Sequence, residues 1–216
     1  MKAIICGSTG LVGQLLLKKL LKDRRFNEVV SVSRQKTGLE DHHLKEVLCP
    51  DFSQLASLQE NLVGDIYFCC LGTTLKKAKS RDQFFKIDHD AICEFAKIAK
   101  AHKAQSFVLI SALGAHPQSY VFYNRVKGQT EEDLKRLQLK HLVILRPGLL
   151  LGKRHEFRLL EFLFIRSVTW VKSLFSCVWL AHWTTDPEIL VDVMIHHSFE
   201  GLDHQLVVLE SNQIMS

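Results

Sequence analysis

A tyrosine and a lysine four residues apart, Tyr123 and Lys127, are the residues of this sequence best suited in type and spacing to chemistry. In a helix, two residues at this spacing lie on one face. A free tyrosine has a pKa of about 10 and exchanges protons poorly at neutral pH, but a neighbouring ammonium group stabilises the phenolate and lowers that pKa. The sequence therefore predicts that Tyr123 is a general acid or base tuned by Lys127.

Ser111 is the third candidate for catalysis, and it closes the apolar run Phe107-Val108-Leu109-Ile110 twelve residues before Tyr123. Its hydroxyl could hydrogen-bond a substrate oxygen on which charge develops. Tyrosine and lysine at this spacing are also a common pair on helix surfaces. Tyr120 begins the same helical stretch but has Asn124 four residues later, so Tyr123 is preferred. The prediction therefore depends on the elements that position these side chains.

A glycine-rich turn near the N-terminus predicts a second kind of site. The expected strand Lys2–Cys6 leads into Gly7-Ser8-Thr9-Gly10-Leu11-Val12-Gly13, and a helix is expected over Leu11–Leu21. Glycines let the backbone approach a pyrophosphate closely, and the free N–H groups and dipole of the helix N-terminus attract its charge. We expect a dinucleotide here, and the alternative is a turn that needs its glycines only for steric reasons.

The residue after the second expected strand, Val29–Ser33, is Arg34, and no acidic residue stands at that tip. An acidic residue there binds the ribose hydroxyls of NAD, whereas an arginine accommodates the 2′-phosphate of NADP. Arginine can also bind a phosphate through two parallel hydrogen bonds. The sequence therefore favours NADP(H) over NAD(H), and the alternative is a solvent-exposed loop arginine.

Other residues at the carboxyl ends of expected strands could also touch the cofactor. Asp51 and Phe52 could flank the adenine, and Leu71, Gly72, Thr73 and Thr74 could run beside the riboses. Each stretch could equally be an ordinary exit from a strand.

The elements that must hold these residues alternate between strand and helix. Strands are expected at Lys2–Cys6, Val29–Ser33, Glu46–Cys49, Ile66–Leu71, Ser106–Ser111 and Leu142–Arg146, and helices at Leu11–Leu21, Gln54–Asn61, Gln83–His102 and Tyr120–Leu137. Continuous apolar strands indicate a parallel sheet covered by helices on both faces. We therefore predict an α/β fold, a Rossmann-type doubly wound parallel sheet in a single domain over residues 1–216. Residues 1–152 would be the cofactor-binding core, and residues 153–216 a small helical part that binds a substrate or a partner.

Composition excludes several classes of protein. The 216 residues carry a net charge of +5, and scattered Lys and Arg give no support to nucleic-acid binding. We expect no integral membrane segment, since charged residues interrupt the apolar stretch 157–183. Eleven histidines without His-x-x-x-His or His-Glu-x-x-His spacing predict no metal site. Six cysteines without Cys-x-x-Cys spacing, and no signal peptide, lead us to expect a reduced, cytoplasmic protein.

The glycine turn together with Ser111, Tyr123 and Lys127 resembles the short-chain dehydrogenase/reductase superfamily, in its extended or atypical form. Three further stretches resemble the Tat-interacting protein family of atypical NADPH-binding members. They are Leu71-Gly72-Thr73-Thr74 with the lysine-rich loop after it, Lys86-Ile87-Asp88-His89-Asp90, and Arg146-Pro147-Gly148-Leu149-Leu150-Leu151-Gly152. The likeness covers about Met1 to Arg154. It implies a Rossmann-type fold, NADPH binding, Ser111, Tyr123 and Lys127 as the catalytic set, and Pro147 and Gly148 beside the nicotinamide. Asp88 stands near a position where many superfamily members have asparagine.

Two functions follow as hypotheses. The first is an NADPH-dependent oxidoreductase that reduces a small carbonyl compound or related electrophile. The alternative is a non-catalytic NADP(H) sensor that binds a protein partner, through the apolar stretch 157–183. A homodimer is also possible. A sugar-nucleotide epimerase is disfavoured, because the region after Gly152 is short.

Overall fold

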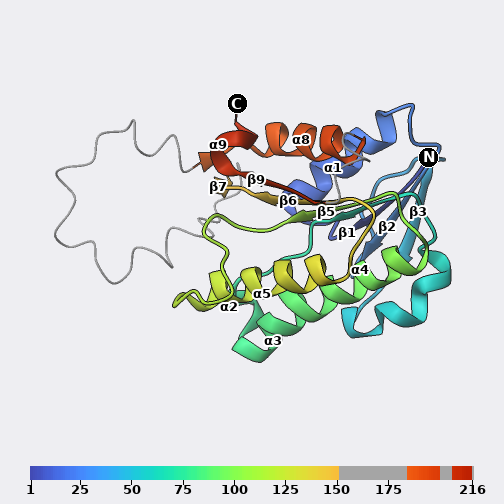
Figure 1. Ribbon diagram of the computed structural model, residues 1–216. Helices are drawn as coiled ribbons and strands as arrows, with labels where there is room; N and C mark the ends of the chain where they lie inside the picture. The colour runs from blue at the N-terminus through green and yellow to red at the C-terminus, as the bar shows by residue number, and fades with distance from the viewer. Residues whose placement is uncertain (151–183, 200–205, 216) are drawn as a thin grey trace.

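The computed structural model describes residues 1–150, 184–199 and 206–215, and a parallel sheet of seven strands lies at its centre (Figure 1). In order across the sheet the strands are β3 (Leu44–Leu48), β2 (Glu28–Ser33), β1 (Lys2–Cys6), β4 (Ile66–Cys69), β5 (Ser106–Ile110), β6 (Leu142–Arg146) and β9 (Leu206–Glu210). Two short strands, β7 (Leu149–Leu150) and β8 (Thr184–Thr185), pair with each other. The strand order reverses between β1 and β4, and in open parallel sheets ligands bind at the carboxyl ends of the strands beside such a reversal.

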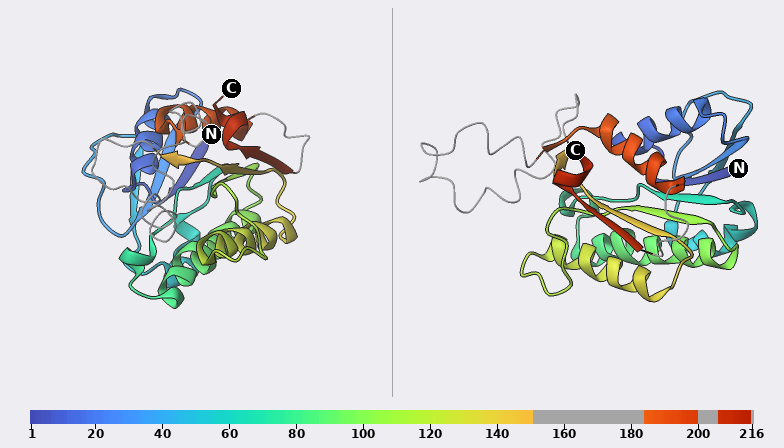
Figure 2. Two further views of the ribbon diagram at one scale, coloured as in Figure 1. Left: turned by 90° about the vertical axis from the view of Figure 1, so that its left-hand side faces the viewer. Right: turned by 45° about the horizontal axis from the view of Figure 1, so that its top comes forward.

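Helices cover both faces of this sheet (Figures 1 and 2). On one face lie α1 (Leu11–Lys22) and α8 (Pro187–Phe199), which share a buried apolar cluster with β1 and β4. The other face carries η1 (Phe52–Asn61), α2 (Leu75–Ala78), α3 (Arg81–Phe85), η2 (Lys86–Asp90), α4 (Ala91–Ala101) and α5 (Phe122–Arg136). The short helix α9 (Ser211–Ile214) follows β9. The predicted α/β, doubly wound fold is confirmed.

The strands are buried apolar runs, as the sequence predicted. β1 and β6 have the predicted bounds, and β2, β3, β4 and β5 differ from them by at most two residues at either end. Two predicted helices differ in kind. The stretch over η1 is a 3₁₀ helix, and the long helix expected over residues 83–102 is α3, the π-helical turn η2 and α4 in succession. A π turn rotates the side chains that follow it and is frequent at functional sites.

The C-terminal residues complete the sheet and one of its layers, which the sequence did not predict. β9 pairs in parallel with β6, so that Arg146 lies opposite Glu210. Helix α8 packs beside α1, where the Lys19 ammonium lies 2.9 Å from Glu188 Oε2 and 2.8 Å from Asp192 Oδ1. β9 is a partly exposed edge strand of five residues, and its pairing with β6 identifies it more clearly than its composition does.

Among the described residues, no helix is long and apolar enough to cross a membrane. The apolar stretch 157–183, in which the sequence predicts no membrane segment, lies outside the described residues. The proposed division at residue 152 falls there too and stays a prediction.

Candidate functional site

Two of the three glycines in the turn at residues 7–13 are required by the protein's own packing, and the third is not. A Cβ added to Gly7 would lie 2.6 Å from the Cys70 carbonyl oxygen, and one added to Gly13 would lie 2.2 Å from the Gly7 carbonyl oxygen. Neither glycine can therefore be replaced without moving the backbone. A Cβ on Gly10 would meet only the Gly7 oxygen, at an ordinary 3.5 Å. The protein itself has room for a side chain at Gly10, so the bare backbone there suits the close approach of a ligand.

The N-terminus of α1 lies on this turn and has no capping side chain. Gly10 is the N-cap and offers no side-chain hydrogen bond, and the first turn of the helix holds no acidic residue. The N–H groups of Leu11, Val12 and Gly13 therefore need another acceptor, which a pyrophosphate can supply. The residues present thus fit the phosphates of a dinucleotide.

Ser8 has a different role from the rest of the turn. Its hydroxyl is buried and lies 2.6 Å from the hydroxyl of Ser31, in the neighbouring strand β2. The Ser8 side chain therefore links the turn to the sheet, and only the backbone of this residue is left for a ligand.

Arg34 lies at the carboxyl end of β2, beside the glycine turn. Together with Thr9, Gln35 and Pro50 it lines a cavity of about 310 Å³. The Ser33 hydroxyl donates a hydrogen bond of 2.5 Å to the Gln35 carbonyl, which closes the backbone around Arg34. The arginine is exposed and makes no ion pair with the described residues. A free guanidinium at this position is suited to bind a phosphate group.

Three of the other predicted cofactor residues have their side chains engaged elsewhere. The Asp51 carboxylate accepts a hydrogen bond from Ser53 N, at the start of η1. Phe52 is buried in the apolar cluster on that face of the sheet. Thr74 caps α2 by accepting from Lys77 N. These contacts lie within the protein, and the assignment of the three residues to the cofactor stays a prediction.

The predicted catalytic residues Ser111, Tyr123 and Lys127 are called the chemical end below. Tyr123 and Lys127 lie one turn apart on α5, and Tyr123 packs on the ring of Phe84, with centroids 5.7 Å apart. The Lys127 ammonium is buried and lies 2.9 Å from Oδ1 of Asp88, which is itself fully buried. Oδ2 of Asp88 accepts a hydrogen bond of 2.8 Å from Thr73 N. Asp88 therefore joins α5 to the loop after β4.

Gly72 lies directly over this pair of charges. A Cβ there would lie 3.5 Å from Asp88 Oδ1 and 3.8 Å from the Lys127 ammonium. The predicted stretch Leu71–Thr74 therefore does bring backbone to the chemical end, where Gly72 places no side chain against the buried ion pair. Leu71 itself is buried in the core.

The charges at the chemical end set the protonation of Tyr123 and Lys127. Burial raises the pKa of Tyr123 above its ordinary value; the Lys127 ammonium lowers that pKa, and the Asp88 carboxylate raises it again. The sequence predicted the effect of Lys127 correctly in sign, but burial outweighs it. For Lys127, burial alone would lower the pKa, yet Asp88 raises it above the ordinary value. At neutral pH the chemical end therefore holds a neutral tyrosine and a charged lysine.

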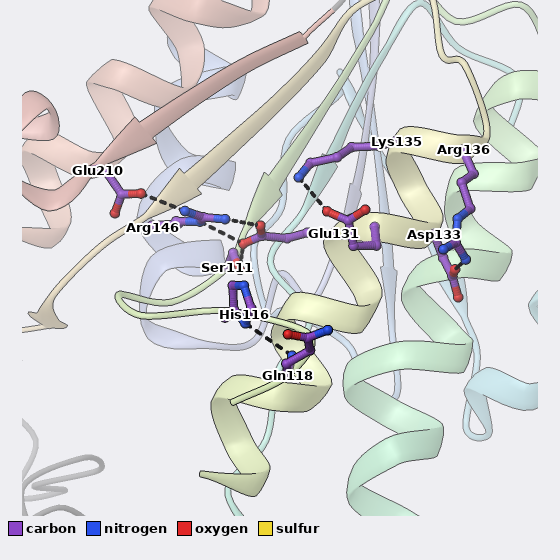
Figure 3. Close-up of polar contacts among 10 residues, drawn as sticks. Ser111, His116, Gln118, Glu131, Asp133, Lys135, Arg136, Arg146 and Glu210 are labelled. Atoms are coloured by element: carbon purple, nitrogen blue, oxygen red, sulfur yellow. Dashed lines mark hydrogen bonds and ion pairs between the residues drawn. The ribbon is translucent and has the colours of Figure 1, made fainter. Parts of the chain in front are cut away.

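Ser111 belongs to a second polar chain, which continues through Glu131 and Arg146 to Glu210 (Figure 3). Its hydroxyl donates a hydrogen bond of 2.5 Å to Oε1 of the buried Glu131. Glu131 is held from its other side by Arg146, whose Nη2 lies 2.5 Å from Oε2, and Arg146 Nη1 in turn contacts Glu210 at 2.6 Å. The hydrogen bonds with Glu131 raise the pKa of Arg146, so this chain is a charged arginine between two carboxylates.

Three residues of the site were missed by the assignment of roles from the sequence, namely Asp88, Glu131 and Arg146. Glu131 follows Lys127 by four residues. The spacing Tyr-x-x-x-Lys-x-x-x-Glu therefore places one phenol, one ammonium group and one carboxylate on the same face of α5. That periodicity is a signal in the sequence. The partners Asp88 and Arg146 come from other elements, and no spacing along the chain indicates them.

Pro147 and Gly148 follow β6 at the same edge of the sheet. The Pro147 carbonyl accepts a hydrogen bond from Leu113 N at 3.0 Å, and Gly148 N donates to the Thr185 hydroxyl at 2.9 Å. Both residues are buried. They fasten the loop after β5 to the C-terminal part of the chain.

Comparison with known proteins agrees with this geometry. The model of a family described as NAD(P)H-binding matches residues 7–161, which include the glycine turn, Arg34 and the chemical end. Protein HTATIP2 of Rattus norvegicus is 31% identical over 217 residues, which is 98% of this chain and 86% of that protein.

Yeast proteins are similar over the N-terminal part. The mitochondrial protein FMP52-1 of Scheffersomyces stipitis is 40% identical over 156 residues, which is 71% of this chain and 69% of that protein. The mitochondrial protein FMP52 of Saccharomyces cerevisiae is 34% identical over a similar length. These names contradict the expected cytoplasmic location. That expectation was wrong because cysteine spacing reports on the redox state of a compartment, and a reducing compartment need not be the cytosol.

Solved structures share the fold at low sequence identity. A short-chain dehydrogenase family protein from Francisella tularensis has a TM-score of 0.67 and 14% identity, with 100% of this chain and 99% of that chain covered. MoeE5 in complex with UDP-glucose and NAD has a TM-score of 0.70 and 12% identity, with 97% and 75% covered. Through the match over residues 7–161 and the likeness to the rat protein along nearly its whole length, the chain belongs to the NAD(P)H-binding family, with the Rossmann-type fold of the short-chain dehydrogenases.

Proposed function

We propose that the protein is an NADPH-dependent oxidoreductase that reduces a small carbonyl compound. The observation that carries the proposal is the arrangement along one edge of the sheet. Arg34, which makes no ion pair with the described residues, stands beside the glycine turn, and the Tyr123–Lys127 pair of α5 lies next to Gly72, across the reversal of strand order. The first group suits a phosphate of the cofactor, and the second suits a proton transfer to a substrate.

The chain offers separate groups for separate parts of NADPH. The N–H groups at the start of α1 would bind the pyrophosphate, and Gly10 would leave room for it. Arg34 would bind the 2′-phosphate, which NADH lacks. When bound, NADPH supplies the hydride of the reduction.

The proton of the reduction would come from Tyr123. Its raised pKa keeps the hydroxyl protonated at neutral pH, as a proton donor requires. The O–H bond of Tyr123 breaks as the substrate oxygen takes the proton, and the Lys127 ammonium stabilises the phenolate left behind. A proton from solvent then restores the tyrosine. Hydride and proton together convert a carbonyl into an alcohol.

The cofactor assignment is tested by thermal unfolding with NADPH and NADH at matched concentrations. NADPH should raise the melting temperature more, because stabilisation depends on ligand concentration relative to Kd. Arg34→Asp should weaken NADPH binding about tenfold to a hundredfold, the value of a hydrogen bond to a charged group. Arg24→Asp is the matched control, since this exposed arginine lies just beyond the C-terminal end of α1. Equal stabilisation by both dinucleotides would contradict the choice of NADP(H).

The reaction is tested by oxidation of NADPH in the presence of a panel of small aldehydes and ketones. Tyr123→Phe removes only the hydroxyl, so turnover should fall about a hundredfold or more, the usual contribution of general acid catalysis. Binding of NADPH to this variant, measured by calorimetry, should be unchanged. Turnover equal to that of the parent would exclude Tyr123 as the proton donor.

A second candidate function is a non-catalytic NADP(H)-binding protein that signals to a protein partner. One observation favours it: Ser111 and Lys127 are engaged by Glu131 and Asp88, and a hydroxyl has only one proton to donate. If this function is correct, the parent protein binds NADPH tightly and oxidises none of it with any member of the panel. Measurable turnover that depends on Tyr123 would exclude it.

The names of the yeast relatives also support a mitochondrial location for this chain. Microscopy of the full chain carrying a C-terminal fluorescent protein, against a mitochondrial marker, tests this. Signal spread evenly through the cell would contradict it.

A further inference from the structure

Three different donor atoms converge where η2, α4 and α5 meet. Nε2 of His89 lies 3.0 Å from Oδ2 of Asp133 and 4.0 Å from Sγ of Cys93. The donor atoms of these three side chains all lie within 4.8 Å of one another. Nitrogen, sulfur and oxygen ligands at such separations match the coordination sphere of a small cation, whose bonds to them are about 2.0–2.3 Å long.

Three elements build this cluster. His89 lies in the π-helical turn η2, and Cys93 follows it by four residues in α4, so both project from one face of a continuous helix. Asp133 comes from α5, which packs alongside. Two ligands at this spacing on one helix and a third from its neighbour are a usual way to build a metal site in helical packing.

Groups around the cluster hold the His89 ring and the Asp133 carboxylate in place. Nδ1 of His89 lies 2.9 Å from Oδ1 of Asp90, which leaves Nε2 directed at the other two donors. Histidines that bind metals nearly always give their second nitrogen to a carboxylate or carbonyl in this way. The histidine ring stacks on Phe85 with centroids 4.3 Å apart, which fixes its plane. Arg136 pairs with Oδ1 of Asp133 (Figure 3), and Oδ2 is the oxygen that contacts His89.

Burial is graded across the three donors. Cys93 is 8% exposed, the His89 side chain 14% and the Asp133 side chain 43%. An ion can therefore enter from the side of Asp133, and the same side leaves a fourth position open to water. A mixed set of imidazole, thiolate and one carboxylate suits Zn²⁺, whereas Mg²⁺ and Ca²⁺ prefer oxygen ligands alone.

We propose that His89, Cys93 and Asp133 bind one Zn²⁺ ion, with Asp90 as the orienting partner of His89. A search for His-x-x-x-His spacing does not find this site, because the second ligand on the helix is a cysteine. Without the ion, burial and the Asp133 charge raise the pKa of Cys93 to about 12, so the thiol is neutral. Binding displaces its proton to solvent as the Zn–S bond forms.

A simpler interpretation is that His89 only hydrogen-bonds Asp90 and Asp133 and so links the turn η2 to α5. It accounts for the two carboxylates and gives Cys93 no part. The two interpretations differ in the role of Cys93 Sγ, which binds the ion in the first and has no part in the second.

The site has a structural consequence for the chemical end. It joins the turn η2 to α5, the same elements that the Asp88–Lys127 ion pair joins, and His89 is the residue after Asp88. A bound ion would hold the π turn that directs Asp88 at Lys127. The proposal does not depend on the proposed reaction.

The experiment uses the full chain without an affinity tag, first freed of metal with a chelator. Titration with Co²⁺, followed by absorption, reports a thiolate ligand through its charge-transfer band, and calorimetry with Zn²⁺ gives stoichiometry and affinity. Cys93→Ser tests the sulfur ligand and Asp133→Asn the most exposed ligand, which is the safer change for folding. The control is the double variant His42→Ala, His43→Ala, because Asp41, His42 and His43 form another group of possible ligands on an exposed loop.

We expect about one equivalent of Zn²⁺ and a thiolate–Co²⁺ band. The band should vanish in Cys93→Ser, and Zn²⁺ affinity should fall at least tenfold in that variant and in Asp133→Asn, while the control keeps both. Asp90→Asn should keep the band and lose about tenfold to a hundredfold in affinity, the usual effect of a second-shell partner. Absence of the band in the parent, or loss of binding in the control alone, would overturn the proposal.

Discussion

The two halves of the site differ in how fully their polar groups are satisfied by the protein itself. At the cofactor side, Arg34 has no ion-pair partner among the described residues, and the first turn of α1 has no cap. At the chemical end, Lys127 is paired with Asp88, and Ser111 with Glu131. The cofactor side therefore has groups available to a ligand, whereas Lys127 and Ser111 at the chemical end already have partners within the protein.

This difference separates binding from chemistry. A dinucleotide meets a backbone already shaped by Gly7 and Gly13, so little order has to be created on binding. A substrate at the chemical end must compete with buried charges that already have partners, and a buried charge left unpaired is costly. The structure therefore accounts for cofactor binding more directly than for turnover.

The largest expected effect is at the chemical end. Lys127→Met should lower the free energy of unfolding by about 3–5 kcal/mol, because it leaves Asp88 charged and unpaired in the interior. The double variant Asp88→Asn, Lys127→Met should recover most of that loss, since the asparagine oxygen still accepts from Thr73 N. Urea unfolding measures both.

Lys97→Met is the control for this pair, because Lys97 and Glu94 form an ion pair on the surface, with side chains 60% and 33% exposed. It should cost at most about 1 kcal/mol. A Lys127→Met variant as stable as this control would mean that the chemical end is not held together by its own charges.

The glycines give the next largest effect and test the open side. Gly13→Ala should cost about 1–3 kcal/mol of stability, because its Cβ would overlap the Gly7 carbonyl. Gly10→Ala should leave stability within about 0.5 kcal/mol and weaken NADPH binding at least about tenfold, or ~1.4 kcal/mol. Thermal unfolding with and without NADPH separates the two. If Gly10→Ala binds NADPH normally, the cofactor does not approach the turn at that residue.

Ser111→Ala should have a smaller effect on stability, about 1.5 kcal/mol, because Glu131 loses one hydrogen bond and keeps Arg146. Ser106, at the other end of β5, has a buried hydroxyl without a partner in the described part of the chain. Ser106→Ala should therefore be neutral within about 0.5 kcal/mol or slightly stabilising. Urea unfolding of both variants checks the contrast, and equal losses would remove the special role of the Glu131 contact.

The smallest effect is on the pH dependence of stability. The pKa of Tyr123 is raised in the folded state, so its contribution is fully present below the unfolded value of about 10 and is lost as pH rises toward the folded value. Tyr123→Phe should remove that loss, up to about 1.4 kcal/mol per pH unit above about pH 10.

The measurement is urea unfolding of parent and variant between about pH 9 and pH 11. Tyr120→Phe is the control, because Tyr120 is fully exposed and should leave the slope of the parent unchanged. Identical slopes for Tyr123→Phe and the parent would show that Tyr123 ionises as freely in the folded protein as in the unfolded chain.

Much of the fold could be predicted because its signals are local. The strands β1 and β6 are apolar runs with turn residues at their ends, and their predicted bounds are those of the structure. β9 and α8 were missed, since a short edge strand is identified by its partner β6. The π turn η2 was read as ordinary helix, because residues 83–102 keep the apolar pattern of one helix throughout.

The site shows the same contrast between local signals, which the sequence carries, and tertiary contacts, which it does not. Tyr123, Lys127 and the glycine turn share short spacings, so the sequence could group them. Phe52 and Thr74 were assigned to the cofactor from their position after a strand, and that assignment stays a prediction; what the sequence did not indicate is that the Phe52 side chain packs in the core and that Thr74 caps α2. Position along the chain does not tell which way a side chain turns.

By itself, the sequence determined the elements of the predicted dinucleotide site and their order: a strand, a glycine turn, a helix N-terminus, and an arginine after the next strand. These features lie within a few residues of one another, where backbone geometry alone brings them together. Only the tertiary structure decided the partners of Ser111 and Lys127. Glu131 and Asp88 reach them because α5 packs against β6 and η2, and burial there makes each charge depend on a partner from a distant part of the chain.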